Sequence, residues 1–332
     1  MTDPLVSVLV LSYNQADFLA AAIESAVAQT WRNLEVIVVD NGSTDASPAV
    51  LDGFEHDSRV TIIRHSENGP ITARMNEAVR MARGDWVSFL FSDDLYRPGM
   101  VEHQLRAALA AEPSVGVVYC PTIVEDVRTG ATSVSPSIAV SGWIFEDLMR
   151  RPLDGPVQMI AALIDRRAML AHPFHEELFV EGESIFFRLA LYERFLYVDE
   201  PLVVSRDHAS NMGKAIIRNR DWVLRVHDRL RAEPGLQPKW LPLVNRHQAI
   251  NLRSFAWQGA RLGADRGWVR NCLRRAAAQD PRSLSHPHAL GATALVMAPL
   301  SVAKLANRLG DRLAPDHNRR IVEHYDGHTR DR

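Results

Sequence analysis

The stretch VSVLVLSYNQADFLAAAIESAVAQTWRNLEVIVVDNGSTD, residues 6–45, decides the fold class. Its two apolar runs, 6–12 and 34–40, are rich in β-branched residues and have the composition of strands buried on both faces. Between them, residues 16–30 repeat apolar side chains at helical spacing, and Asn14 is placed to cap that helix. A helix between two such strands predicts a parallel βαβ unit.

The same alternation of strand and helix continues to about residue 120. Further apolar runs of strand type occupy 60–65, 86–91 and 115–120. The intervening helices are expected to start after Ser43 or Thr44, to span 71–84 with Gly84 as the end signal, and to run from Pro98 to Ala111. This order predicts an α/β fold with a doubly wound, mostly parallel sheet.

The remainder of the chain follows a different pattern. A hairpin is expected to turn at Thr129-Gly130, and residues 157–165 have the composition of a strand. After about residue 215, long helical patterns replace the strands, and a polar tail follows residue 311. We therefore expect two regions, an α/β domain over 1–215 and a C-terminal helical appendage over 216–332.

Bulk properties exclude several classes of protein. The chain has 332 residues, 46% of them hydrophobic and 23% charged, with a net charge of -2, so the composition does not favour nucleic-acid binding. Its two cysteines, Cys120 and Cys272, are far apart, which argues against a disulfide framework or a zinc site and favours a reducing cytoplasm. The N-terminal residues have no basic region and only a short apolar run, so we expect no signal peptide. The apolar stretch 289–306 is too short and interrupted to span a membrane, but leaves peripheral contact with its inner face open. Nothing in the sequence indicates the oligomeric state.

Polar residues follow four of the expected strands at their carboxyl ends, where ligands bind in open parallel sheets. These residues are Ser12, Tyr13 and Asn14 after the first strand, Asp40 after the second, Asn68 after the third, and Ser92, Asp93 and Asp94 after the fourth. One polar strand end has little meaning, whereas four on one edge predict a binding site.

The quoted stretch, together with ENGPITARMNEAVRMARGDWVSFLFSDD (67–94), resembles the family 2 glycosyltransferases, which have the GT-A fold. The resemblance covers roughly residues 5–210. It implies an inverting, metal-dependent transfer of a sugar from a nucleoside diphosphate donor, with UDP favoured. The implied acceptor is a hydroxyl of a glycan or lipid-linked glycan in the synthesis of a surface polysaccharide.

The resemblance also implies roles for residues that bind the donor. Asp40 would hydrogen-bond the nucleotide base, Tyr13 would pack beside it, and Arg74 would contact the base or the phosphates. Each has a simpler alternative: a cap within the DNGSTD turn for Asp40, an aromatic at the rim for Tyr13, and a solvated helix face for Arg74. The other candidates for donor binding are Ser12, Asn14, Asn68 and Ser92.

The acid pair at 93–94 is the expected metal site, because carboxylate oxygens suit Mn²⁺ or Mg²⁺. Adjacent side chains in extended chain point to opposite faces, so we expect Asp93 to ligate directly and Asp94 to act through water or ribose. The family's usual motif has a further acid where this chain has Phe91. By resemblance, His208 would be a third ligand, and its alternative is a structural histidine.

The catalytic base is less clearly marked. The family places an aspartate at a position that is Gly182 or Ser184 here, and neither side chain can accept the proton. Glu183, or else Glu181, is the candidate replacement. The alternative is a catalytically impaired module that binds a nucleotide sugar without transferring it. A nucleotidyltransferase or dinucleotide enzyme is disfavoured, since the chain lacks GxGxxG after its first strand and has no phosphate-binding loop of the GxxxxGK[ST] type.

Overall fold

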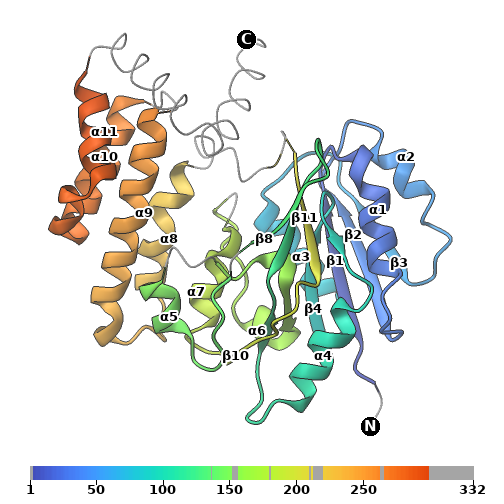
Figure 1. Cartoon of the computed structure of the whole chain (residues 1–332). Coiled ribbons are helices and arrows are strands. Elements are labelled where there is room, and N and C mark those ends of the chain that lie inside the picture. Colours follow the sequence, from blue (N-terminus) through green and yellow to red (C-terminus); the bar gives the residue numbers. More distant parts are fainter. Residues whose placement is uncertain are drawn as a thin grey trace. The chain divides into compact units, whose positions relative to one another are not determined.

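A mixed seven-stranded sheet forms the centre of the first part of the chain (Figure 1). The structure is a computed structural model that describes residues 3–135, 137–151, 156–178, 181–208, 211, 220–261 and 265–298. The strand order is β10-β6-β9-β4-β1-β2-β3. The strands are β1 (Val6–Ser12), β2 (Leu34–Asp40), β3 (Val60–Arg64), β4 (Trp86–Phe91), β6 (Val117–Tyr119), β9 (Ala162–Asp165) and β10 (Phe195–Tyr197).

The sheet is parallel except at one strand. β9 pairs antiparallel with both β4 and β6 and lies between them. β9 is also shorter than the strand predicted at 157–165, because a 3-10 turn at Met159–Ala161 precedes it. The expectation of an α/β, mostly parallel sheet is confirmed.

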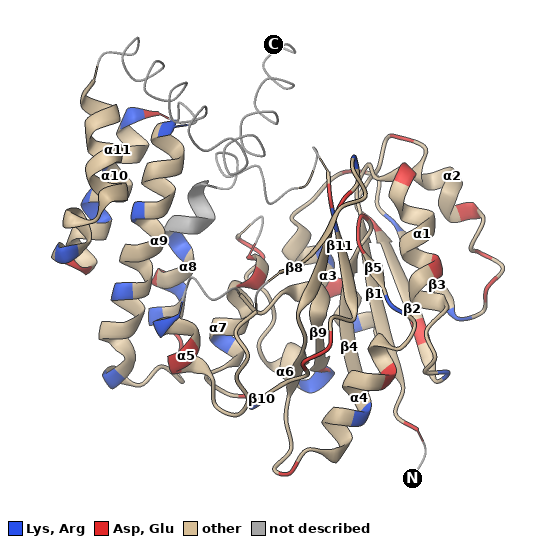
Figure 2. Ribbon diagram, in the orientation of Figure 1, with Lys and Arg blue, Asp and Glu red and all other residues tan. Residues whose placement is uncertain are grey.

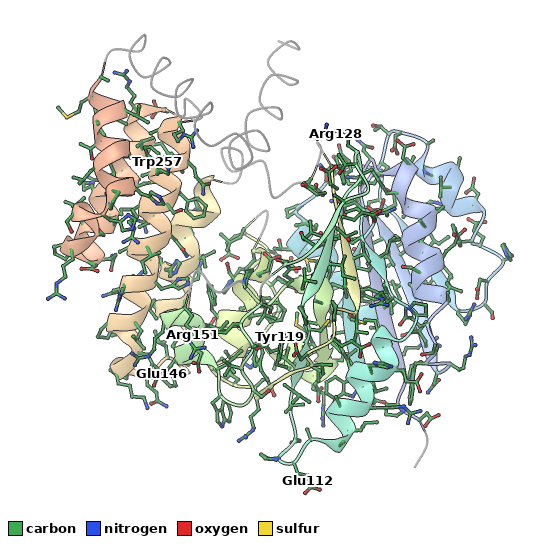
Figure 3. All side chains as sticks on the ribbon, viewed as in Figure 1. Glu112, Tyr119, Arg128, Glu146, Arg151 and Trp257 are labelled. Carbon is green, nitrogen blue, oxygen red and sulfur yellow. The ribbon has the colours of Figure 1, made fainter. Side chains whose placement is uncertain are left out.

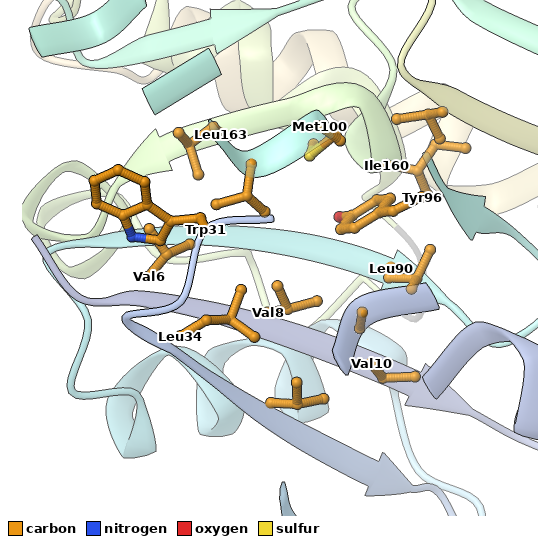
Figure 4. Packing of buried hydrophobic residues seen from close by; sticks show 14 of the residues in the cluster. Val6, Val8, Val10, Trp31, Leu34, Leu90, Tyr96, Met100, Ile160 and Leu163 are labelled. Carbon is orange, nitrogen blue, oxygen red and sulfur yellow. The ribbon is translucent and has the colours of Figure 1, made fainter. Parts of the chain in front are cut away.

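Helices cover both faces of this sheet. They are α1 (Ala16–Val27), α2 (Ser47–Asp52), α3 (Ile71–Met81), α4 (Met100–Ala110) and α6 (Arg166–Ala171). The same part of the chain also contains α5 (Phe145–Arg150) and α7 (Ile185–Leu189). β1 and β2 are buried along their whole length, as a strand with helices on both sides must be. Figure 4 shows Val6, Val8 and Val10 in a row along β1, on the face covered by α1 and α4. Leu9 alternates to the face where α3 packs.

A second, four-stranded sheet has the order β5-β11-β7-β8 and contains β5 (Leu95–Tyr96), β7 (Thr122–Asp126), β8 (Thr132–Ser135) and β11 (Val203–Asp207). β7 and β8 form the hairpin predicted at Thr129-Gly130, and Arg128 marks its tip (Figure 3). β11 pairs antiparallel with β5, directly after the acid pair 93–94. This pairing brings β11 beside the end of β4.

Several predicted helix boundaries differ from the structure. Gly84 does not end α3, which stops at Met81; its N–H donates to Ser7 Oγ at 2.9 Å, and a Cβ at Gly84 would lie 2.6 Å from that oxygen. The glycine therefore permits close approach to β1. α4 starts at Met100 after Pro98 and Gly99, and α2 starts at Ser47 without a side-chain cap from Ser43 or Thr44.

The chain divides into two compact units, residues 1–207 and 208–332. The predicted boundary at 215/216 falls in a segment outside the described residues. The second unit contains α8 (Arg220–Arg231), α9 (Leu241–Arg261), α10 (Arg266–Gln279) and α11 (Pro287–Met297). Helices α9, α10 and α11 share an apolar core, and Trp257 of α9 stacks on a histidine of α11 at a 5.8 Å ring separation (Figure 3). No helix within the described segments is long and apolar enough to cross a membrane.

Candidate active site

The carboxyl ends of β4, β1 and β2 lie next to one another and bring the predicted residues to one edge. Ser12 pairs with Asp40 across β1 and β2, and the N–H of Ser92 donates to the Leu11 carbonyl at 3.0 Å. Ser12, Asp40 and Ser92 are all buried at this edge. The Ser12 hydroxyl is a buried polar atom with no hydrogen-bond partner among the described residues. Such an atom is suited to a ligand, because leaving it unsatisfied costs free energy.

Side chains join the loops after β1 and β2. Asn14 accepts a hydrogen bond from the Thr44 N–H at 2.8 Å, and its own N–H donates to Ser43 Oγ at 2.9 Å. Asn14 adopts a positive φ of 51°, and its role is thus to fix the loop rather than to cap α1. Asp40 accepts from the Ser43 N–H at 3.1 Å. Tyr13, next to Asn14, is 39% exposed and offers its ring to solvent.

The loops after β2 and β3 meet at Asn41, a residue that the sequence analysis did not single out. Its side-chain amide donates to Asn68 Oδ1 at 2.8 Å and to the Gly69 carbonyl at 2.9 Å. Its oxygen accepts from the Gly69 N–H at 3.0 Å and from Arg74 Nε at 2.8 Å. Asn41 therefore links two predicted donor-binding residues, Asn68 and Arg74, to the end of β2. Gly42, at φ 76°, lets the turn pass against the backbone of residue 67, where a Cβ would lie at 2.4 Å.

The acid pair is held by Arg206 of β11. The guanidinium of Arg206 donates to the carbonyl oxygen of Asp93, to that of Ser92 at 3.4 Å and to that of Phe18 at 3.2 Å. It also lies over the Phe18 ring, 4.8 Å from the centroid. The N–H of Arg206 donates to Asp94 Oδ1 at 3.0 Å. One residue thus fixes both the backbone of the turn and one of its carboxylates.

The two acids occupy different environments. Asp94 is buried, with 5% of its surface exposed, whereas Asp93 is partly exposed. Burial, with the charge of Asp93 added, raises the pKa of Asp94 to about 8, even though hydrogen bonds from Arg206 and Ser205 oppose that rise. Burial also lowers the pKa of the Arg206 guanidinium. Two carboxylates placed so closely are stable as ions only with further positive charge beside them.

The third predicted metal ligand, His208, follows β11 directly and opens the second compact unit. Its backbone N–H donates to Asn211 Oδ1 at 2.7 Å. Within the described ranges, no group of three or more His, Cys, Asp or Glu side chains is arranged to hold a metal ion. A cation at Asp93 and Asp94 would therefore take most of its shell from water or ligand oxygens, as Mg²⁺ commonly does.

The two candidate bases differ sharply. Glu181 is buried and accepts the His175 N–H at 2.7 Å, and its carboxylate pairs with Arg188 at 3.3 Å. The side chain of Glu183 is exposed. Desolvation of its carboxyl by the surrounding protein raises its pKa. The preceding segment is attached to α3, because Thr72 Oγ1 donates to the Leu178 carbonyl at 2.7 Å. This attachment joins the segment before the two glutamates to the helix that carries Arg74.

Comparison with known proteins agrees with this geometry. The sequence model described as glycosyl transferase family 2 matches residues 7–167. EpsH of Bacillus subtilis is 32% identical over 222 residues, which are 64% of this chain and 63% of EpsH. ExoO of Rhizobium meliloti, a succinoglycan biosynthesis protein, is 42% identical over 127 residues, 38% of this chain and 36% of ExoO. The matched region thus spans less than two thirds of either relative.

Solved structures show the same fold at low sequence identity. Residues 1–349 of TarS from S. aureus, in complex with UDP, match with a TM-score of 0.63 at 17% identity, covering 92% of both chains. The mannosyltransferase PcManGT from Pyrobaculum calidifontis, in complex with GDP-Man and Mn²⁺, matches with a TM-score of 0.59 at 19% identity. It covers 98% of this chain and 85% of PcManGT. The GT-A architecture expected from the sequence is therefore confirmed.

Proposed function

Because residues 7–167 of this chain belong to glycosyl transferase family 2, we propose that the protein is an inverting, metal-dependent glycosyltransferase. It moves a sugar from a nucleoside diphosphate donor to a hydroxyl of a glycan or lipid-linked glycan during synthesis of a surface polysaccharide. Solved neighbours bind UDP, UDP-GlcNAc and GDP-Man, and ExoO acts in succinoglycan biosynthesis. We propose UDP as the nucleotide and the cytoplasm as the location, which is consistent with two buried free cysteines.

The observation that carries this proposal is the acid pair at the end of β4. Asp94 is buried beside a second carboxylate, and burial together with the charge of Asp93 raises its pKa. Carboxylates are the oxygen donors that Mn²⁺ and Mg²⁺ prefer, so these residues fit a divalent cation. Asp93 and Asp94 would hold it, with His208 as a proposed third ligand. When bound, such an ion neutralises the charge that gathers on a departing diphosphate.

The other rim residues are proposed to bind the donor. Asp40, at the buried end of β2, would accept a hydrogen bond from the base, and the exposed ring of Tyr13 would pack beside it. Arg74 is oriented by Asn41 and supplies positive charge for the base or the phosphates. Ser12, Asn14, Asn68 and Ser92 complete this set of proposed donor contacts.

Glu183 is the proposed base. The side chain of Glu183 is exposed and therefore accessible to an acceptor hydroxyl. It takes the hydroxyl proton as the acceptor oxygen bonds to the anomeric carbon. The bond to the diphosphate breaks on the opposite side, which inverts the configuration. Glu181 is already engaged by Arg188 and His175, and its contacts favour a structural role.

One observation favours a second candidate, a module that binds the nucleotide sugar without transferring it. Gly182 occupies one of the two positions where the family places its aspartate, and it has a positive φ of 56°. With Glu181 in an ion pair, Glu183 is the one remaining carboxylate of the segment 181–184.

Product formation from a panel of UDP-sugars, with and without Mn²⁺, tests both candidates. We expect Asp93→Asn to abolish metal-dependent turnover, and Glu183→Gln to lower kcat by roughly 10²–10⁴-fold with unchanged affinity for the donor. Glu112→Gln, an exposed acid in the turn before β6, is the control and should behave like the wild-type chain (Figure 3). Donor binding without any product would support the binding module. Full activity of Asp93→Asn would exclude the metal assignment.

A further inference from the structure

The net charge of -2 conceals two regions of opposite charge. Residues 1–207 contain 16 Lys and Arg against 30 Asp and Glu, a net charge of -14. Residues 208–332 contain 22 Lys and Arg against 10 Asp and Glu, a net charge of +12. Figure 2 marks the positions of Lys and Arg on the ribbons of α8, α9 and α10 in blue. Such an asymmetry points to an anionic partner for the helical unit.

The basic residues of α10 form a row. Arg266, Arg270 and Arg274 are four residues apart and therefore lie along one side of the helix. Arg270 and Arg274 are exposed, while the opposite side of α10, which includes Val269 and Cys272, is buried in the shared core. α10 contains no acidic residue, and neither exposed arginine forms an ion pair within the part of the chain that the structure describes. Their charge is available to a partner.

An apolar row lies on the neighbouring helix. Leu290 is 57% exposed and Met297 is 77% exposed, and their seven-residue spacing places them on one side of α11. Ala292 and Val296, on the other side, are buried. The turn before α11 adds Leu284, which is 42% exposed. Exposed apolar side chains arranged in this way indicate contact with a partner rather than scattered surface residues.

The two rows are adjacent. The guanidinium of Arg266, in the first turn of α10, donates to the carbonyl oxygen of Ala298 at 2.7 Å, directly after Met297 at the end of α11. The arginine row thus starts beside the end of α11 that carries its most exposed apolar side chain. We name Arg266, Arg270, Arg274, Leu284, Leu290 and Met297 the α10–α11 surface.

We propose that the α10–α11 surface docks on an anionic lipid bilayer, with the arginines at the phosphate headgroups and the apolar row at the acyl boundary. Arginines attract an anionic leaflet, and exposed leucine and methionine gain free energy by leaving water at the headgroup level. A soluble polyanion would use the arginines but not the apolar row. A second copy of the chain docking through the same surface would bring like charges together. This assignment does not depend on the proposed reaction.

Co-sedimentation of the full chain with phosphatidylcholine vesicles, with and without phosphatidylglycerol, tests the docking surface. We expect binding only where phosphatidylglycerol is present, weakened by NaCl. The pair Arg270→Gln and Arg274→Gln should reduce the partition coefficient by about fivefold per arginine. The pair Leu290→Ser and Met297→Ser should reduce it by roughly tenfold and should remain damaging at high salt. All four side chains are exposed, so the variants are expected to fold, which circular dichroism checks.

Two matched controls lie in the first unit. Leu109→Ser on α4 removes a leucine that is also 57% exposed, and Arg128→Gln removes an exposed arginine at the β7–β8 turn. Both should bind vesicles like the wild-type chain. Absence of vesicle binding, equal binding by all variants, or binding to soluble heparin without binding to vesicles would each overturn the proposal. Turnover on a soluble acceptor should be unchanged in the arginine pair and in the apolar pair of substitutions. This readout separates the test of docking from the test of the proposed reaction.

Discussion

Replacing Arg206 with methionine is the most informative single change in the first unit. The substitution retains a long apolar side chain and the backbone N–H that donates to Asp94. It removes the guanidinium that donates to the carbonyl oxygens of Phe18, Ser92 and Asp93 and that covers the Phe18 ring. The turn after β4 then loses the guanidinium link to Phe18 of α1, while the hydrogen bonds from the Ser92 N–H to Leu11 and from the Arg206 N–H to Asp94 remain.

The expected cost follows from these contacts. Three carbonyl oxygens lose a charged donor, each worth on the order of 1 kcal/mol net, with water replacing part of the loss because Arg206 is only partly buried. The contact with the aromatic ring contributes about 0.5–1 kcal/mol. Above about pH 8, where Asp94 is ionised, its carboxylate also loses the positive charge of Arg206 while remaining buried beside Asp93. We expect Arg206→Met to lower the free energy of unfolding of the first unit by about 3 kcal/mol.

Urea unfolding followed by circular dichroism, with one transition fitted to each compact unit, measures this loss. Arg206→Lys should recover part of it, since lysine keeps the charge but not the planar fork. Arg167→Met is the control, because Arg167 is an exposed arginine whose pair with Asp165 at 2.7 Å lies on the surface; its change should stay below about 0.5 kcal/mol.

A double-mutant cycle separates the two roles of Arg206. Asn at position 94 still accepts the backbone N–H but carries no charge. Above about pH 8, where Asp94 is ionised, Arg206→Met should therefore cost at least about 1 kcal/mol less in the Asp94→Asn background. The reasoning is refuted if Arg206→Met stays within about 0.5 kcal/mol of the wild-type chain. Equal costs in the two backgrounds would refute the electrostatic part alone.

Three further predictions concern other parts of the molecule. Burial lowers the pKa of His247 to about 4 and that of its hydrogen-bonded partner His227 well below its usual value. Below about pH 6.5 these histidines bind protons in the unfolded chain but stay neutral in the folded pair. The free energy of unfolding of the second unit is therefore highest above about pH 6.5 and decreases as the pH falls toward about 4. His247→Gln should reduce the difference in melting temperature between about pH 7 and pH 5. Asn41→Ala removes the link between the loops after β2 and β3, and should weaken UDP binding with Mn²⁺ by about tenfold in calorimetry; an unchanged affinity would contradict the proposed donor site. Gly84→Ala places a Cβ against the backbone and side chain of β1 and should lower the free energy of unfolding by about 2 kcal/mol in thermal melts. An unchanged stability would mean that β1 shifts to make room for the Cβ.

The parallel strands and their helices were predictable because the signal for each lies in its own residues. The buried run 6–12 and the helical spacing of 16–30 specify a βαβ unit without reference to distant residues. Residues 157–165 have the composition of a strand, but composition carries no direction, and so the antiparallel placement of β9 was not foreseen. Gly84 resembles a helix-ending glycine because the contact that requires it lies at Ser7, far away in sequence.

The same distinction applies to the site. Polar residues at strand ends, such as Asp40 and Asp93, could be identified because the topology places all carboxyl ends at one edge. Arg206 could not, since it is 112 residues from Asp94 and looks like an ordinary charged residue near a strand end. Asn41 was not predicted because it lies in the DNGSTD turn, where Asp40 was already the candidate for ligand binding. The pairing of Glu181 with Arg188, seven residues later, depends on a fold of the segment that no short pattern specifies.

The position of β9 affects how the protein emerges from the ribosome. β9 separates β4 from β6 in the sheet, yet it follows both of them in the chain. During synthesis, the facing edges of β4 and β6 present unpaired backbone groups until Ala162–Asp165 has left the exit tunnel. The nascent chain is therefore most prone to pair with a neighbouring polypeptide in that interval, and a ribosome-bound chaperone would protect it best there.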